Sequence, residues 1–460
     1  MTTTEQRPAL VSAEAWQPPP VRVRTARNGI PVYQIPMPGR ELATVHIAVA
    51  PGGACEPADR DGIAALLAAG CAMGPARRLE ATFVDELERH GATLTGGADH
   101  DGSYLTAVVP GHRLPALLDL LAPALARPAL DERWIRSAVA RRAAASRTES
   151  LHPVHRPADT IRRLSYAAGS PYARTARGDA ASLSDVDHEL LRDLHGRWYG
   201  PATTSVIIAG DLDRWRVADR VVDTFGAWDR PVPPAAPPPA TPASQPKWEV
   251  HAAEGARQAV LVLGAAVHCP DLWRLAGLEA AVHALAGWSP SRLNTALREE
   301  MACSYGFHSE FVARRTASGY LAEFRVYGAV DTDRLPAATA RLLAECTDLA
   351  ERGPAVEESR ACIANLAALV PMLAQSVREV VEQTAIGLRR GFALDEIAER
   401  APVMAGLPPA AVREAAHALA PRRLNLALIG DPAGGVAALE PLAAALGIPV
   451  VRAGGEPAVS

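Results

Sequence analysis

An arginine and a tyrosine seven positions apart, Arg298 and Tyr305, have the residue types and spacing to act on one carbonyl group. A guanidinium offers a rigid fork of N–H donors to a carbonyl oxygen. A phenol can donate to an oxygen that gains negative charge during a reaction. The pair alone also has a structural explanation, in which Arg298 pairs with Glu299 or Glu300 and Tyr305 belongs to the core of a strand.

Histidines at metal-ligand spacing are the next candidates for chemistry. His152 and His155 are three positions apart, but Pro153 lies between them, so we do not expect a helix that presents both on one face. His90 and His100 have no partner at ligand spacing, and the chain lacks the G-x-S-x-G pattern of a serine nucleophile. The sequence therefore predicts no metal site of this chain's own.

Composition excludes several other classes. The six cysteines form no C-x-x-C pair, so we expect buried thiols rather than zinc ligands or disulfides. A net charge of −4 gives no support for a nucleic-acid partner. No apolar run reaches membrane-spanning length, and the first twenty residues lack a signal-peptide pattern. We therefore expect no membrane partner and a cytoplasmic location, and the Ala-, Arg- and Pro-rich composition is typical of a bacterial chain.

The elements that must position these residues show mixed periodicity. Runs such as ATVHIAVA, YLTAVV and TSVIIAG are typical of strands, and Asn28-Gly29 predicts a hairpin turn. Runs such as DGIAALLAAGCAM and RLPALLDLLAPAL have helical spacing. Hairpin strands come first and helices follow in blocks. This order predicts an α+β fold in which helices cover a mainly antiparallel sheet.

Two sets of landmarks indicate a duplication. Residues 201–211 (PATTSVIIAGD) and 421–431 (PRRLNLALIGD) share a proline, a β-rich run and Gly-Asp, at an offset of 220 residues. Arg113 and Arg334 each open an Arg-Leu-Pro before a helical run, at an offset of 221. Offsets this similar, in matching order, predict two homologous domains.

A proline-rich stretch separates the two repeats. Proline lacks an N–H donor and fixes φ, so such a run favours an extended polyproline spacer over helix or sheet. A surface loop inside one domain is the alternative. We predict the following division: a flexible N-terminus at 1–21, a first domain at 22–228, the linker at 229–247, a second domain at 248–448 and a flexible tail at 449–460.

The stretch HIAVAPGGACEPADRDGIAALLAAGCAM carries the first part of a family resemblance. Over about residues 22 to 446 the chain resembles the pitrilysin/insulinase (inverzincin) peptidases, which include mitochondrial processing peptidase. In that family the matching helix carries H-x-x-E-H, whose histidines bind zinc and whose glutamate activates water. Here the three positions hold Ala65, Ala68 and Ala69, and alanine offers no donor atom to zinc. The third family ligand falls near 137–146, a run without an acidic residue.

The second part of the resemblance surrounds the Arg/Tyr pair. GWSPSRLNTALREEMACSYGF is similar to the family motif S-R-L-x-x-x-L-R-E-x-x-G-L-x-Y, whose arginine and tyrosine reach the substrate peptide bond at a partner's zinc. The resemblance places Arg298 and Tyr305 in that role, although Ala302 and Cys303 replace the family's Gly and Leu. It also implies substrate contacts from Gly287, Trp288, Ser289, Ser291 and Arg292, where a helix-capping turn at Gly287–Pro290 is the alternative.

Together these matches imply a non-catalytic, substrate-binding subunit of a heterodimeric metallopeptidase. The partner would be a homologous subunit that carries the zinc, and this chain would hold no cofactor of its own. The substrate would be a small precursor or leader peptide. The alternative is a structural scaffold subunit resembling the core proteins of respiratory complex III, which has no need of Arg298 or Tyr305. An enzyme active by itself is disfavoured by the alanines at 65, 68 and 69.

Overall fold

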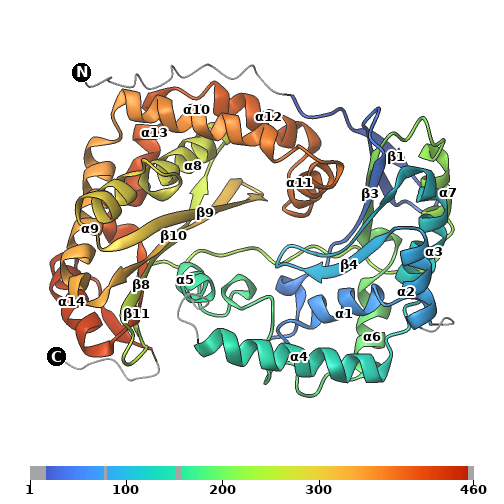
Figure 1. The fold of residues 1–460 in the computed structure, drawn as a ribbon, viewed down its shortest axis with the longest axis horizontal. Helices are drawn as coiled ribbons and strands as arrows, with labels where there is room; N and C mark the ends of the chain where they lie inside the picture. Colours follow the sequence, from blue (N-terminus) through green and yellow to red (C-terminus); the bar gives the residue numbers. More distant parts are fainter. Residues whose placement is uncertain (1–16, 77–79, 152–156, 454–460) are drawn as a thin grey trace, which may run out of the picture.

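Two six-stranded sheets frame the part of the chain that the structure describes, one in each half of the molecule (Figure 1). The structure is a computed structural model and describes residues 17–76, 80–151 and 157–453. His152 and His155 lie outside these residues. The remaining candidate residues all lie inside them.

The first sheet has the strand order β1-β2-β6-β3-β5-β4. β2 and β6 are parallel and the other neighbours are antiparallel. The predicted hairpin is present, because β1 pairs with β2 and Gly29 has a φ of 93° in the turn between them. The strands are β1 (Arg22–Thr25), β2 (Pro31–Pro36), β3 (Leu42–Val49), β4 (Thr93–Ala98), β5 (Ser103–Pro110) and β6 (Thr204–Gly210).

The second sheet repeats this topology, in the order β12-β7-β11-β8-β10-β9. Its one internal parallel pair, β7 with β11, corresponds to β2 with β6, and the added edge strand β12 is also parallel. The predicted duplication and the mainly antiparallel α+β class are therefore confirmed. The strands are β7 (Trp248–Ala252), β8 (Gln258–Cys269), β9 (Ser304–Thr316), β10 (Gly319–Asp331), β11 (Asn425–Gly430) and β12 (Val450–Arg452).

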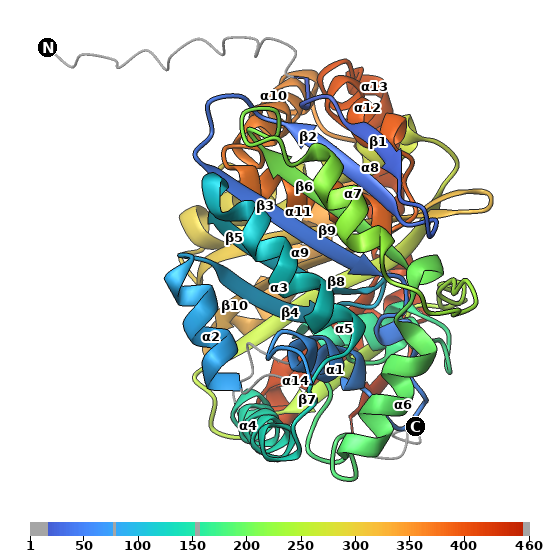
Figure 2. The same ribbon diagram turned by 90° about the vertical axis from the view of Figure 1, so that its right-hand side faces the viewer.

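Helices cover the outer face of each sheet, as Figure 2 shows for the first sheet and Figure 1 for the second. In both repeats a short 3₁₀ turn leads directly into a helix with proline near its start, at Leu114 and at Leu335, where proline costs no hydrogen bond. The first half has α1 (Ile63–Cys71), α2 (Glu80–Arg89), α3 (Leu114–Ala126), α4 (Glu132–Leu151), α5 (Pro157–Ser165), α6 (His188–Trp198) and α7 (Ala218–Gly226). The second half has α8 (Leu272–Ala286), α9 (Leu335–Arg352), α10 (Val356–Met372), α11 (Val377–Arg389), α12 (Leu394–Ala405), α13 (Pro409–Ala416) and α14 (Pro432–Leu446).

The two halves exchange one helix each. α11 belongs to the second repeat but packs Val377, Val380 and Val381 against the first sheet. In return α5 packs Ile161 and Leu164 against the second sheet. The two helices begin 220 residues apart, which is the offset of the repeat. Each sheet therefore depends on the other half to bury its inner face.

The proline-rich stretch 229–247, described throughout, contains neither helix nor strand. It is tied to the end of α5 by hydrogen bonds from Ala167 N–H to the Thr241 carbonyl and from Ala243 N–H to the Ser165 carbonyl, both 2.9 Å. The stretch therefore passes the end of the exchanged helix and is hydrogen-bonded to it.

A cluster of buried charges also joins the halves. Arg314 on β9 contacts Asp101 of the first half and Glu323 of β10, and its side chain is 9% exposed. Arg389 at the end of α11 donates to Asp99 and to the ring of His46, both at 2.9 Å. The halves are thus fixed by ion pairs as well as by apolar packing.

Among the described helices, none is by itself both long and apolar enough to cross a membrane, whereas α10 and α11 together, bent by 115°, reach that length and composition.

Candidate functional site

Arg298 and Tyr305 lie on either side of one tight junction in the second half. Arg298 is on a π-helical turn, Asn294–Glu300, and Tyr305 is the second residue of β9. π-helical turns widen a helix by one residue and occur frequently at functional sites. Three residues, 301–303, separate the π-helical turn from β9, so the two side chains are placed by the same short segment.

A bulge turns Tyr305 out of the sheet. Phe307, two positions later, is 1% exposed, so strict alternation along β9 would bury Tyr305 as well. Instead the β9–β10 register shifts between Gly328 and Val330, which leaves one extra residue on β9 at this point. As a result Tyr305 is 90% exposed. The alternative of a core tyrosine at this position is wrong.

The backbone at this junction is strained. Ala302 has a φ of +49°, in the left-handed region that favours glycine. This is the position at which the family motif has glycine, and here an alanine, which is less suited to this conformation, takes it. Cys303 then points inward, 1% exposed, with its thiol 3.4 Å from the Leu297 carbonyl.

Asn294 holds the parts of the junction together. Its side-chain amide donates to the carbonyls of Trp288, at 2.9 Å, and Phe307, at 3.2 Å. Its carbonyl accepts from Phe307 N–H at 2.6 Å. The side chain is buried, so these bonds fix the turn before the helix and the start of β9 relative to each other.

Within the described residues Arg298 has no ion pair, and its side chain is exposed. The neighbouring Glu300 pairs instead with Arg341 of α9, at 2.9 Å. The alternative in which Glu299 or Glu300 neutralises Arg298 therefore does not describe this geometry. Arg298 and Tyr305 both present donors to solvent, as a residue that meets a second molecule must.

The predicted contact segment before the helix divides into two parts. Gly287 ends α8, with its N–H bonded to the His283 carbonyl at 2.8 Å, as in the capping alternative. Trp288 stacks on the ring of His283, and Ser289 is exposed. Ser291 is 1% exposed. Only the first part of the segment is thus open to a ligand.

Arg292 is engaged inside the second half. Its guanidinium donates to both carboxylate oxygens of Glu358, at 2.8 and 2.9 Å, and to Asp348 at 2.6 Å. These partners also raise its pKa, chiefly through the hydrogen bonds to Glu358. The geometry indicates that Arg292 ties the start of the π-helical turn to α9 and α10. Its predicted substrate contact would have to compete with both carboxylates.

In the first half, α1 carries the three alanines of the family's zinc motif. Ala68 is buried and its carbonyl lies against β4, where a Cβ added to Gly96 would come within 2.1 Å of it. Ala65 and Ala69 are partly exposed. Methyl groups supply no ligand, so the residues present here do not fit a zinc ion.

The start of α1 is built around a buried acid. Glu56 accepts from the N–H groups of Gly62, at 3.0 Å, and Ala64, at 2.7 Å. Burial raises the pKa of Glu56 to about 8, against the opposing effect of these two donors. The side chain therefore caps the helix largely in its protonated form near neutral pH.

The region of the third family ligand is basic. On α4, Arg142 makes two bonds to Glu149, at 2.9 and 2.6 Å, and Arg177 approaches the same carboxylate at 3.7 Å. The nearest acid is therefore held in ion pairs. Among the described residues, no group of three or more His, Cys, Asp or Glu side chains is arranged to hold a metal ion.

Buried histidines serve the packing of the first half. Burial and the guanidinium of Arg389 lower the pKa of His46 to about 3, so its neutral ring accepts from Arg389 and bonds Thr106 at 2.8 Å. Burial lowers the pKa of His100, which bonds the Arg174 carbonyl at 2.8 Å.

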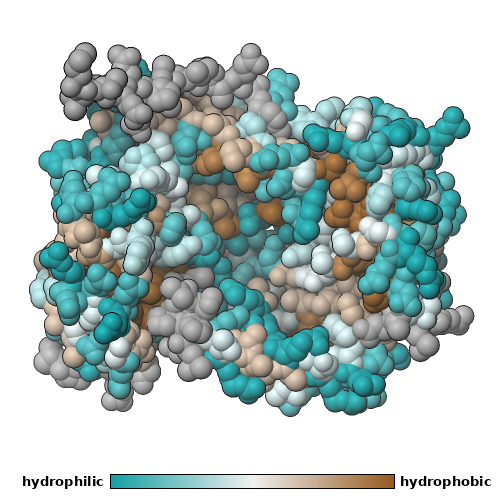
Figure 3. All heavy atoms as spheres, in the orientation of Figure 1, coloured by the Kyte–Doolittle hydropathy of each residue, from teal (hydrophilic) through white to brown (hydrophobic). Residues whose placement is uncertain are grey.

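Sequence reasoning did not indicate an apolar pocket between α10, α11 and α12. It has a volume of about 600 Å³. Figure 3 shows apolar side chains gathered around a hollow in the upper middle of the molecule, over these helices. The lining comes mainly from these three helices, with Glu279 of α8, Phe311 of β9 and residues 18–21, which no local pattern would have brought together.

The chain belongs to the insulinase peptidase family. Residues 34–171 match the family model described as Insulinase (Peptidase family M16). Residues 185–366, which include Arg298 and Tyr305, match the model described as Peptidase M16 inactive domain. The predicted resemblance is confirmed. Among curated proteins, none matches the chain significantly.

Solved structures share the whole fold. A peptidase M16 inactive domain from Pseudomonas fluorescens is 18% identical, with a TM-score of 0.79 over 89% of this chain and 98% of that one. A protease from Helicobacter pylori is 16% identical, with a TM-score of 0.77 over 90% and 100%. A chain of complex III2 from Candida albicans is 14% identical, with a TM-score of 0.70 over 91% and 97%. At these identities the likeness concerns the fold.

Proposed function

We propose that this chain is the non-catalytic, substrate-binding subunit of a heterodimeric zinc metallopeptidase that cleaves a small precursor or leader peptide. Its partner is a homologous subunit that carries the zinc. The observation that carries the proposal is the exposure of Tyr305, 90%, on a bulge next to the turn of Arg298, which is exposed and has no ion pair within the described part of the chain.

The state of the first half supports a divided site. α1 keeps its position against β4 but offers only methyl groups at Ala65, Ala68 and Ala69. The second half, in contrast, keeps donors on a segment braced by Asn294. A chain that has the substrate-polarising donors but lacks the zinc ligands is suited to complete the active site of another subunit.

The chemistry assigned to the pair is polarisation of the scissile carbonyl. The guanidinium of Arg298 orients the carbonyl, and the hydroxyl of Tyr305 donates to the oxygen as it gains charge in the tetrahedral intermediate. Zinc and the attacking water come from the partner. The strained turn at Ala302 and the bulge give the segment a fixed shape before substrate arrives, which lowers the cost of organising the transition state.

The test is a peptidase assay on a mixed peptide library with zinc. This chain, a homologous subunit with an intact H-x-x-E-H from the same source, and their mixture are assayed in parallel. We expect cleavage by the mixture, and its loss with Arg298→Ala or Tyr305→Phe. Arg197→Ala is the matched control, since Arg197 is an exposed arginine, at 60%, on the outer helix α6 (Figure 2).

Two outcomes would contradict the proposal. Cleavage by this chain alone would show that its own residues suffice for catalysis. A mixture that associates but cleaves nothing would favour the scaffold alternative. Association is therefore measured beside cleavage, by sedimentation of the same mixtures.

A further inference from the structure

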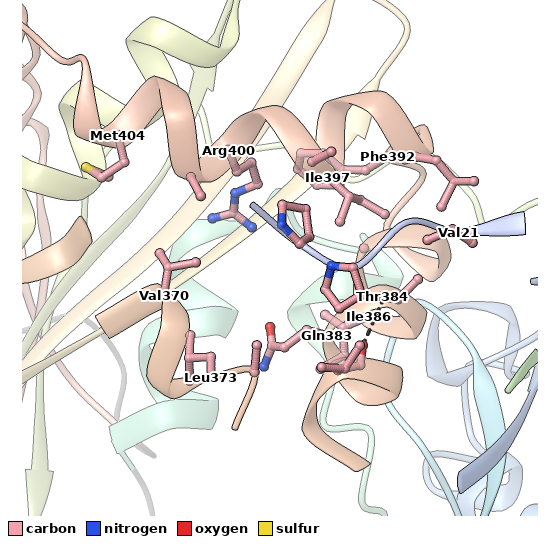
Figure 4. Close-up of a pocket in the computed structure, with 18 of the residues that line it drawn as sticks. Val21, Val370, Leu373, Gln383, Thr384, Ile386, Phe392, Ile397, Arg400 and Met404 are labelled. Carbon is pink, nitrogen blue, oxygen red and sulfur yellow. Dashed lines mark hydrogen bonds between the residues drawn. The ribbon is translucent and has the colours of Figure 1, made fainter. Parts of the chain in front are cut away.

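The pocket between α10, α11 and α12 is partly filled by the chain's own N-terminal segment. Pro18, Pro19, Pro20 and Val21 form one wall of it, ahead of β1. In Figure 4 this segment passes between Ile397 and Arg400 on one side and Thr384 and Ile386 on the other. We refer to residues 18–21 as the proline segment.

The proline segment fits the groove chemically but fills it incompletely. Three successive prolines favour an extended polyproline conformation with no internal hydrogen bonds, and grooves lined with aromatic side chains bind such segments. Phe311 and Phe392 supply aromatic lining here. Yet about 600 Å³ stays open beside the segment, a volume typical of a ligand site. Open apolar volume forfeits dispersion contacts that larger side chains would make.

The apolar surface continues beyond the pocket. Leu369, Met372 and Leu373, at the end of α10, are 37%, 55% and 51% exposed. Leu369 and Leu373 also line the pocket itself. A ligand that covers this surface as well as the pocket must be longer than a small molecule, because the surface extends past the rim.

The rim suits an uncharged ligand with carbonyl groups, because the acidic and basic side chains that line the pocket balance one another: Glu279, Asp395, Arg390 and Arg400. Arg400 is paired with Glu279 at 3.3 Å and lies over the ring of Phe392, so its charge is already balanced. Gln383 lines the pocket with an exposed side chain. An amide at this place can donate to the free carbonyls of an extended backbone.

We propose that this groove is a binding site for an extended, proline-containing peptide segment with bulky apolar side chains, and that residues 18–21 are a weaker self-ligand that such a segment displaces. Leucine side chains in place of proline rings would fill the open volume and cover the exposed end of α10. The site lies on elements other than the Arg298 junction, and its occupancy does not depend on proteolysis.

The experiment measures fluorescence anisotropy of two labelled peptides on the full chain without any partner. One probe is fluorescein-Gly-Leu-Pro-Leu-Pro-Pro-Leu-Pro-Gly, and the other has serine in place of each leucine. We expect the leucine probe to bind about tenfold more tightly than the serine probe. Deletion of residues 1–20, which lie before β1, should lower the Kd of the leucine probe by about threefold or more, because the competing self-ligand is removed.

A pocket-filling variant tests the location. Ala401→Trp on α12 should weaken binding of the leucine probe about tenfold. Ala405→Trp adds the same side chain on the same helix outside the lining and should leave binding unchanged. Equal binding of both probes, or no effect of Ala401→Trp, would overturn the proposal. A third result would also overturn it: the dye 8-anilinonaphthalene-1-sulfonate binds, Ala401→Trp weakens its binding, and neither peptide binds. The pocket would then be a site for small apolar molecules.

Discussion

Arg314 and Asp101 are 213 residues apart in sequence, yet Nε of Arg314 donates to Oδ1 of Asp101 at 2.7 Å in the buried seam between the halves. Tyr172 donates to the same oxygen at 3.0 Å. On its other side Arg314 meets Glu323, whose pKa burial tends to raise but Arg162 and Arg314 lower to about 2. One guanidinium thus neutralises a carboxylate from each half.

Replacing Arg314 with methionine should destabilise the protein strongly. Two buried carboxylates would each lose their shortest ion pair and keep only longer ones, Glu323 with Arg162 at 3.4 Å and Asp101 with Arg390 at 3.6 Å. Breaking a buried ion pair typically costs about 3–5 kcal/mol. The free energy of unfolding is measured by urea titration. Arg24→Met is the control, because Arg24 and Asp219 form an exposed pair worth at most about 1 kcal/mol. Equal effects of the two variants would contradict this account of the seam.

Glu56→Gln should change how stability depends on pH. The folded pKa of Glu56, about 8, lies above its ordinary pKa of 4.5, so its contribution to stability is complete below pH 4.5 and is lost as pH rises from there through 8. Glutamine stays neutral, but it has a single carbonyl oxygen, so it keeps only one of the two bonds that Gly62 and Ala64 make to separate carboxyl oxygens. We expect the stability of the variant relative to wild type to rise between pH 6 and pH 9, by up to about 3 kcal/mol.

Urea unfolding at both pH values measures this difference. Glu254→Gln, at an exposed turn, serves as the control and should follow wild type throughout. An unchanged difference in stability between Glu56→Gln and wild type at the two pH values would show that folding does not raise the pKa of Glu56.

Ala302→Gly should stabilise the protein. An alanine at positive φ costs about 1–2 kcal/mol, while glycine loses more entropy on folding, so the expected net gain is about 0.5–1 kcal/mol. The sign is the informative result. Ala144→Gly on the exposed side of α4 is the control and should cost about 1 kcal/mol, since that residue is helical. Loss of stability in both variants would mean that the left-handed turn is not strained.

Tyr305→Phe should separate activity from stability. Loss of one donor to a developing oxyanion typically lowers kcat by about 10²–10³. Because the side chain is 90% exposed, the free energy of unfolding of the isolated chain should change by less than about 0.5 kcal/mol. The kcat of the two-subunit mixture and urea unfolding of this chain are the two measurements. A stability loss as large as the activity loss would indicate a structural role.

The repeat and the fold class could be predicted because they depend on local signals. The turn residues around β6 and β11, and the prolines at the starts of α3 and α9, are visible in a single sequence. The positions of α1 and of the Arg298 junction follow from the order of these landmarks along the chain. Local patterns of this kind carry no information about which sheet a helix covers. Helical periodicity alone therefore could not reveal the exchange of α5 and α11.

The details of the site depend on distant partners. The exposure of Tyr305 results from the register of β9 against β10, and alternation within β9 predicts the opposite. Arg292 matches the motif, but its partners Asp348 and Glu358 lie 56 and 66 residues away. The place of the proline segment depends on three helices more than 300 residues further along the chain. In each case the deciding contact is remote in sequence.

The helix exchange sets an order of events during synthesis. The last strand of the first sheet, β6, is complete at Gly210, but α11 ends only at Arg389, about 180 residues later. At ordinary translation speeds this delay is roughly 10–35 s. During that time the inner face of the first sheet, with Ile35, Ile207 and Ala209, has no permanent cover. The nascent first half is therefore a natural client for chaperones, and neither half should be soluble when produced alone.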